Sequence, residues 1–161
     1  MKTLFTTLNI LICVLCINAQ DALKLSDFEI LNNTSWEGQL TYKDYQSGKP
    51  RSIAATTQIK IEGDKIVYNL QYTYEPQKNN KSSVKIKKQG TYYGSEKVIS
   101  NTIENGTRTF VTSYKGKDNG KKATMYITRI FNNKSYKVIK EVQLKNSDER
   151  FVRNTYEFNK L

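Results

Sequence analysis

Several cations of this sequence fall in phase with apolar residues, two positions away from a valine, isoleucine or phenylalanine. Because successive side chains of a β-strand point to opposite faces, this spacing places the cations on the apolar face. A buried charge is costly unless it meets an acid, water or an anionic ligand, and acids are scarce in this phase. The set comprises Lys88, Arg108, Arg129 and Lys140, with Tyr68, Tyr72, Tyr114 and Tyr136 on the same faces.

An apolar wall that carries tyrosine hydroxyls and a few cations would suit an amphiphile with a carboxylate or phosphate group. The sequence leaves two other positions open for these cations. A one-residue slip at a β-bulge would turn the cations outward, and long side chains could reach water at the rims of a sheet. The candidate ligand-binding residues are Arg108, Arg129, Tyr68, Tyr72, Tyr114 and Lys140.

The residues needed for the common catalytic and metal sites are missing. The chain has no histidine, and its two cysteines, Cys13 and Cys16, lie in an apolar N-terminal segment. This excludes Ser-His-Asp and Cys-His nucleophiles, His-ligated haem and the usual zinc sites. No glycine-rich phosphate loop and no calcium-loop spacing is present. We therefore expect no enzyme activity, no cofactor and no metal site.

Residues 1–19 have the pattern of a secretory signal peptide. Lys2 provides a short positive region, residues 8–16 form an apolar core, and Ala19 precedes a polar residue. The core is too short for a transmembrane helix. We expect cleavage after Ala19, export to the periplasm or the extracellular space, and a single mature domain over residues 20–161.

The mature chain is strongly basic. Removing the leader takes away one lysine and no acid, which lowers the formal net charge from +11 to +10. Such a charge favours anionic partners, among which lipid headgroups and acidic glycans suit an exported protein better than nucleic acid does. Lysines on outward strand faces also keep a β-protein soluble and protect its edges, which is an equally good explanation.

Alternation with a period of two runs through the chain from Trp36 onward. Trp36, Gly38, Leu40 and Tyr42 alternate with polar residues, and tight turns such as Asn105-Gly106 separate the later runs. The connections are too short for parallel crossovers, and a short helix over 26–31 could cover one end. The expected strands are 34–45, 51–61, 66–74, 83–93, 97–104, 107–114, 123–131, 135–144 and 150–158.

Closing a long meander removes its exposed edges, so a barrel is favoured over a Greek-key sandwich, which would need a long crossing connection. A membrane barrel would carry its apolar face outward, whereas the polar faces here are rich in Lys, Thr, Gln and Asn. The predicted fold class is all-β: an antiparallel up-and-down meander closed into a soluble β-barrel of eight to ten strands, with a short N-terminal helix.

This layout resembles the lipocalin-like (calycin) group. In that group a Gly-x-Trp motif opens the first strand and an arginine near the C-terminus packs over the tryptophan. Here the sequence is Ser35-Trp36-Glu37-Gly38, so the glycine follows the tryptophan by two positions. The resemblance implies that Trp36 and Arg153, with Arg150 as the alternative, close one end of the barrel.

Members of the group bind fatty acids, retinoids, haem or biotin, which implies a binding function. Two readings follow. The first is an exported binding module that holds a small hydrophobic or amphiphilic anion, or a lipid, inside the barrel. The second is a non-enzymatic structural or interaction protein with a packed barrel, whose basic surface docks on an anionic envelope component.

Overall fold

The computed structural model describes residues 22–161, so the expected signal peptide and its cleavage site lie outside the described residues. Ten strands and three short 3-10 helices make up this part of the chain. They are η1 (Leu25–Leu31), β1 (Thr34–Lys43), β2 (Pro50–Glu62), β3 (Lys65–Tyr72), η2 (Pro76–Lys78), β4 (Asn80–Lys87), η3 (Lys88–Gly90), β5 (Tyr92–Tyr93), β6 (Glu96–Glu104), β7 (Thr107–Asp118), β8 (Lys121–Phe131), β9 (Ser135–Leu144) and β10 (Arg150–Lys160).

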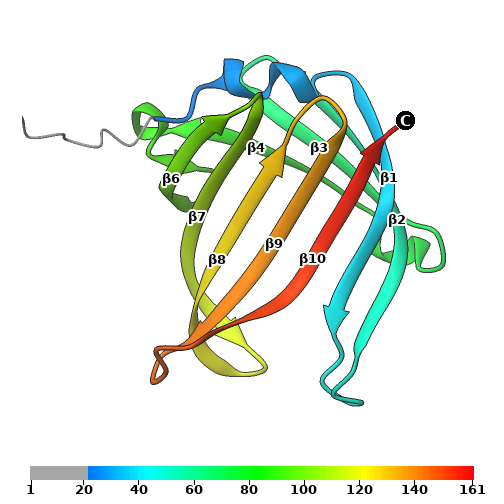
Figure 1. Ribbon diagram of the computed structural model, residues 1–161, viewed down its shortest axis with the longest axis vertical. Coiled ribbons are helices and arrows are strands. Elements are labelled where there is room, and N and C mark those ends of the chain that lie inside the picture. The colour runs from blue at the N-terminus through cyan, green and yellow to red at the C-terminus, as the bar shows by residue number, and fades with distance from the viewer. Residues whose placement is uncertain (1–21) are drawn as a thin grey trace, which may run out of the picture.

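The strands form one closed antiparallel barrel in which every strand pairs with its neighbours in sequence and β10 pairs with β1 (Figure 1). This confirms the predicted up-and-down barrel. The turns form where glycine or asparagine tolerates a positive φ, as at Gly63 and at Asn105-Gly106. Among the described residues, no helix has the length and apolar character needed to cross a membrane.

The seam between β1 and β10 requires Gly38. It lies opposite Phe158, and a Cβ atom at this position would come within 1.8 Å of the carbonyl oxygen of Glu157. Such an overlap with backbone cannot be relieved by a side-chain movement, so only glycine lets the first and last strands approach closely enough to pair. The glycine two positions after Trp36 thus has a direct role in barrel closure.

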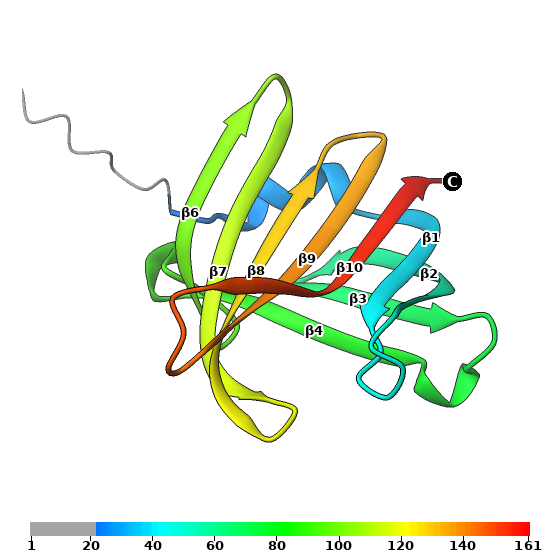
Figure 2. The same ribbon diagram turned by 60° about the horizontal axis from the view of Figure 1, so that its bottom comes forward.

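The helix η1 covers one end of the barrel, which we call the closed end; the opposite end is the open end (Figures 1 and 2). Phe28 and Leu31 of η1 are fully buried, and Phe28 contacts the rings of Tyr93, Phe110 and Phe131 at centroid distances of 5.6–5.7 Å. The predicted short helix therefore exists and supplies the aromatic centre of the core.

The expected strand 83–93 is interrupted. Gly90, at φ +89, lies against the backbone of Leu23, whose N–H donates to the Gly90 carbonyl, and the chain turns through η3 to reach it. The turn shifts the alternation of inward and outward side chains by one residue, so Tyr93 is buried and Tyr92 is not. The expectation that Lys88 points inward is therefore wrong: it is exposed, and its Nζ lies 4.3 Å from the ring centroid of Tyr92.

The shortness of β5 leaves part of the barrel wall without strand pairing. On that side, β4 pairs with β5 only at Ile86 and Lys87, and the pairing of β6 with β7 ends at Ser113. Within the described residues, no strand pairs with β4 from Asn80 to Val84 on this side, and β7 beyond Ser113 pairs with β8 alone. We call this interruption the side opening.

Candidate functional site

A cavity of about 200 Å³ lies inside the barrel, below the residues that fill the closed end. This volume corresponds to about six or seven water molecules and is below the range of about 300–1,000 Å³ typical of drug-sized ligands. The cavity therefore fits a small molecule or one end of a longer one. Its lining is Thr57, Tyr68, Leu70, Asn80, Ser82, Val84, Tyr93, Arg129, Tyr136, Val138, Tyr156 and Phe158.

Four phenols give this cavity its polar character. The hydroxyls of Tyr68 and Tyr93 lie 2.5 Å apart, and the hydroxyl of Tyr156 lies 2.6 Å from that of Tyr72. Burial raises the pKa values of Tyr68, Tyr93, Tyr136 and Tyr156 above the ordinary tyrosine value. The phenols consequently stay protonated at physiological pH and act as neutral donors and acceptors around an apolar wall.

Arg129 is the cation of the cavity wall and is neutralised inside the barrel. Its Nη1 donates to Glu96 and to the hydroxyl of Thr112, each at 3.0 Å, and its guanidinium lies 4.6 Å from the ring centroid of Tyr93. Burial disfavours the charge, but Tyr93 and Glu96 outweigh this effect and raise the pKa of Arg129. The guanidinium is thus permanently charged and held in a fixed orientation.

Arg108 also lies on the inner face, but it is held at the closed end. Its Nη2 forms an ion pair with Asp27 of η1 at 3.0 Å, and its Nη1 donates to Asn101 at 2.9 Å. It does not line the cavity. The structure thus gives Arg108 and Arg129 separate carboxylate partners, Asp27 and Glu96, which corrects the expectation that inner acids are scarce.

Lys140 and Tyr114 lie on the inner face nearer the open end. Lys140 pairs with Ile127 across the ladder, and its Nζ is 6.0 Å from the ring centroid of Tyr114. Within residues 22–161 no carboxylate oxygen comes within 4.0 Å of this Nζ. Lys140 stands two positions from Val138, which lines the cavity, so it is an inner cation without an acid partner on a strand that forms part of the cavity wall.

The six predicted ligand-binding residues are therefore distributed over three levels of the barrel. Tyr68 and Arg129 line the cavity, and Tyr72 hydrogen-bonds a lining residue. Lys140 and Tyr114 lie toward the open end, whereas Arg108 lies at the closed end. The alternation pattern did not identify Tyr93, Tyr156 and Glu96 as site residues. Of these, Tyr156 could have been found, because its two-residue spacing from Phe158 indicates an inner face on β10.

Trp36 lies at the closed end and is fully buried. Its Nε1 donates to the Thr34 hydroxyl at 2.7 Å, and that hydroxyl donates to the carbonyl of Leu31 at 2.6 Å. Its ring contacts Tyr136, a cavity-lining residue, at a centroid distance of 6.1 Å. Trp36 therefore connects the first strand both to η1 and to the wall of the cavity.

Arg153 does not reach Trp36, so the expected closure pair is absent. The register of β10 shifts at Arg153, close to the open end, whereas Trp36 lies opposite Lys160 at the closed end. Arg153 instead pairs with Asp118 at 3.3 Å and stacks on Tyr45, whose hydroxyl donates to the same carboxylate. Burial and Asp118 raise the pKa of Tyr45 to about 12. The alternative, Arg150, stacks on a tyrosine of the outer face.

Comparison with known proteins shows that this chain resembles solved structures in its fold. No protein-family model matches the chain, and no curated protein matches it in sequence. The structure is similar to the crystal structure of Rv2717c from M. tuberculosis, with a TM-score of 0.59 and 9% sequence identity over 85% of this chain and 96% of that chain. A mutant of the fluorescent protein UnaG aligns with a TM-score of 0.37 and 11% identity, over 80% of this chain and 94% of that one.

The closed antiparallel meander, its short helix over one end and the buried tryptophan at the start of the first strand agree with the resemblance seen in the sequence. At the level of fold, the chain is a closed antiparallel up-and-down β-barrel with a short helix over one end, and it shares this fold with Rv2717c.

Proposed function

We propose that this protein is an exported, non-enzymatic binding module that holds a small amphiphilic anion inside its barrel. The observation that carries the proposal is the cavity of about 200 Å³, which has an apolar and phenolic lining and whose wall includes Val138, two positions before Lys140 on β9. A barrel packed solidly with side chains would have favoured a purely structural role instead.

The chemistry of the inner face indicates which end of the ligand is charged. Arg129 already has Glu96 as its partner, so it adds hydrogen-bond donors to the wall without adding net charge. Lys140 has no such acid, so it is the group that a ligand carboxylate would neutralise. Charge-assisted hydrogen bonds contribute roughly 1.5–3 kcal/mol each. The apolar part of the ligand would lie against Leu70, Val138 and Phe158.

The side opening supplies a route into the cavity. Asn80 and Ser82 line the cavity and are also exposed to solvent, and both belong to the segment of β4 that lacks a neighbour on one side. A ligand can therefore reach the interior through the wall, without displacement of η1 from the closed end.

The proposal predicts selectivity for a charged chain over a neutral one of the same length. We expect octanoate to bind about tenfold more tightly than octan-1-ol, because only the carboxylate can pair with Lys140. In Lys140→Met this preference should fall to about threefold or less. The titration can be followed by the fluorescence of Trp36, the single tryptophan, which contacts the lining residue Tyr136.

Lys137→Met is the matched control, because Lys137 lies on the same strand but pairs with Glu157 on the outer face. This variant should keep the preference of the wild-type protein for octanoate. If neither octanoate nor octan-1-ol binds saturably, the cavity is not a ligand site of this kind. A preference that persists in Lys140→Met would assign the charge recognition to another residue.

Export predicts a defined mature N-terminus. We expect the protein produced with its own leader to begin at Gln20, or within about two residues of it, because the apolar core of the leader ends shortly before Ala19. N-terminal sequencing of the protein recovered outside the cytoplasm measures this directly. An intact Met1 on the recovered protein would contradict cleavage of the leader, and recovery of the protein from the cytoplasm alone would contradict the proposed location.

A further inference from the structure

A row of three lysines crosses the outer face of the barrel near its open end. Lys117 of β7 pairs directly with Lys122 of β8, and the N–H of Lys145 donates to the carbonyl of Lys122 at 3.0 Å. Lys122 precedes the buried Ala123, so its side chain points away from the core. The three lysines consequently lie side by side on adjacent chain segments, and we call them the lysine row.

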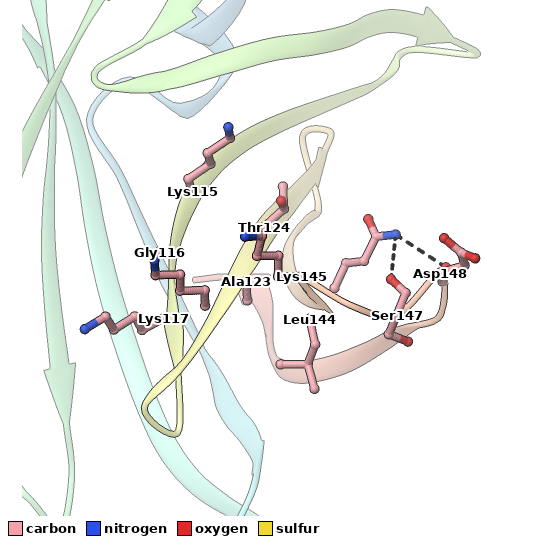
Figure 3. Close-up of a pocket in the computed structure, with 11 residues that line it drawn as sticks. Lys115, Gly116, Lys117, Ala123, Thr124, Leu144, Lys145, Ser147 and Asp148 are labelled. Carbon is pink, nitrogen blue, oxygen red and sulfur yellow. Dashed lines mark hydrogen bonds between the residues drawn. The ribbon is translucent and has the colours of Figure 1, made fainter.

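The lysine row borders a hollow of about 670 Å³ (Figure 3). The loop after β9 forms one wall, and Gln143 braces this loop by donating to the carbonyl of Ser147 at 3.2 Å. Lys115 adds a fourth cation to the lining, and Asp148 is the acid among the lining residues. The lining is Lys115, Gly116, Lys117, Lys122, Ala123, Thr124, Gln143, Leu144, Lys145, Ser147 and Asp148.

The arrangement of these lysines is electrostatically unfavourable by itself. Like charges directly opposite each other destabilise a strand pair, and Lys117 and Lys122 are such a pair. Within residues 22–161, none of the four lining lysines has a carboxylate oxygen within 4.0 Å. An anion placed among the ammonium groups would remove this repulsion, so the hollow favours an anionic occupant.

We propose that the lysine row is a binding site for a phosphate-bearing polyanion. Neighbouring strands lie about 4.8 Å apart, so the backbone positions that carry the three lysine side chains are separated by about this distance. This spacing suits an occupant with two or three negative charges about 5 Å apart. Lysine binds phosphate groups as a mobile point charge, which suits successive phosphates better than one planar carboxylate. This site is separate from the barrel cavity and does not depend on the ligand proposed there.

Tripolyphosphate is the probe, titrated by calorimetry into the purified protein. We expect saturable binding that weakens as salt is raised, because the contact is exposed. The double variant Lys117→Gln/Lys122→Gln should bind about tenfold or more weakly. Its melting temperature without the probe should be no lower than that of the wild-type protein, because the variant removes a repulsive pair.

Lys134→Gln/Lys160→Gln is the matched control for net charge. These two exposed lysines are also neighbours, joined by a backbone hydrogen bond, but they lie at the closed end. This variant should bind tripolyphosphate within about twofold of the wild-type affinity. Equal losses in both double variants, or no saturable binding by the wild-type protein, would overturn the proposal.

Vesicles of phosphatidylglycerol and phosphatidylcholine in equal parts distinguish the two sources of phosphate. If the wild-type protein and the closed-end variant sediment with these vesicles and Lys117→Gln/Lys122→Gln does not, the occupant is a lipid headgroup. If only tripolyphosphate distinguishes the two double variants, the occupant is a soluble phosphate compound. A failed octanoate titration leaves both results unaffected, because the cavity and the lysine row lie on opposite faces of the barrel wall.

Discussion

Replacement of Trp36 by alanine is expected to lower the free energy of unfolding by about 3–5 kcal/mol, the usual cost of truncating a buried large aromatic residue. Trp36 has 0% exposure, and its ring packs on Tyr136. Its indole N–H also donates to the hydroxyl of Thr34, which in turn donates to the carbonyl of Leu31. The substitution therefore creates a cavity and loosens the connection between η1 and the first strand.

Urea unfolding followed by circular dichroism measures this loss, since the variant lacks the only tryptophan fluorophore. Trp36→Phe is the control because it keeps an aromatic ring and loses the N–H donor. We expect less than about half of the alanine effect from it. A loss below about 1 kcal/mol in Trp36→Ala would mean that the closed end is stable without this side chain.

Arg129→Met is expected to destabilise the barrel by about 3–5 kcal/mol, because it leaves Glu96 without its charged partner in the interior. The side chains of Arg129 and Glu96 are only 12% and 19% exposed. The alternation pattern alone shows no inner acid and would have predicted that methionine is tolerated. The ion pair reverses that expectation.

A double-mutant cycle separates the charge effect from the packing effect. Arg129→Met combined with Glu96→Gln should recover about half or more of the lost stability, because the double variant buries no uncompensated charge. Glu96→Gln alone leaves Arg129 with Thr112 as an acceptor and should cost less than Arg129→Met. Additive losses in the double variant would show that the two side chains do not interact.

The strand pattern and turns of this chain could be predicted because each depends on local residue types. The alternation around Trp36 gives β1, and Asn105-Gly106 gives the turn between β6 and β7. The short helix before β1 could also be predicted from the apolar residues around Ser26. These features need no information about distant parts of the chain.

Register shifts in β6 and β10, together with the η3 turn after β4, account for most of the errors. One extra residue in a strand turns every later side chain to the other face. The register of β6 against β7 shifts between Val98 and Ser100. The alternation of inner and outer side chains therefore differs before and after this position, and Glu96, which precedes it, lies on the inner face. The register of β10 shifts at Arg153, which frees that side chain to reach Asp118. Alternation alone does not reveal where a bulge lies.

Long-range partners were the other unpredictable part of the site. Arg108 and Arg129 look like free inner cations in the sequence, because Asp27 and Glu96 belong to η1 and β6 rather than to the same or adjacent expected strands. Lys140 could be identified as an inner cation because β9 contains no irregularity. Its lack of an acid partner could not be predicted, because it depends on where the acids of all ten strands lie in the folded barrel.

The seam between β1 and β10 also determines how the chain can fold. It joins residues from the two ends of the described chain, such as Trp36 and Lys160, so these contacts have the greatest loop-closure entropy in the barrel and high contact order slows folding. Until β10 docks, β1 and β9 each present an open edge that can pair with another molecule. The chain therefore cannot complete its barrel until β10 has been made, and any factor that holds the incomplete chain must shield the edges of β1 and β9 in the meantime.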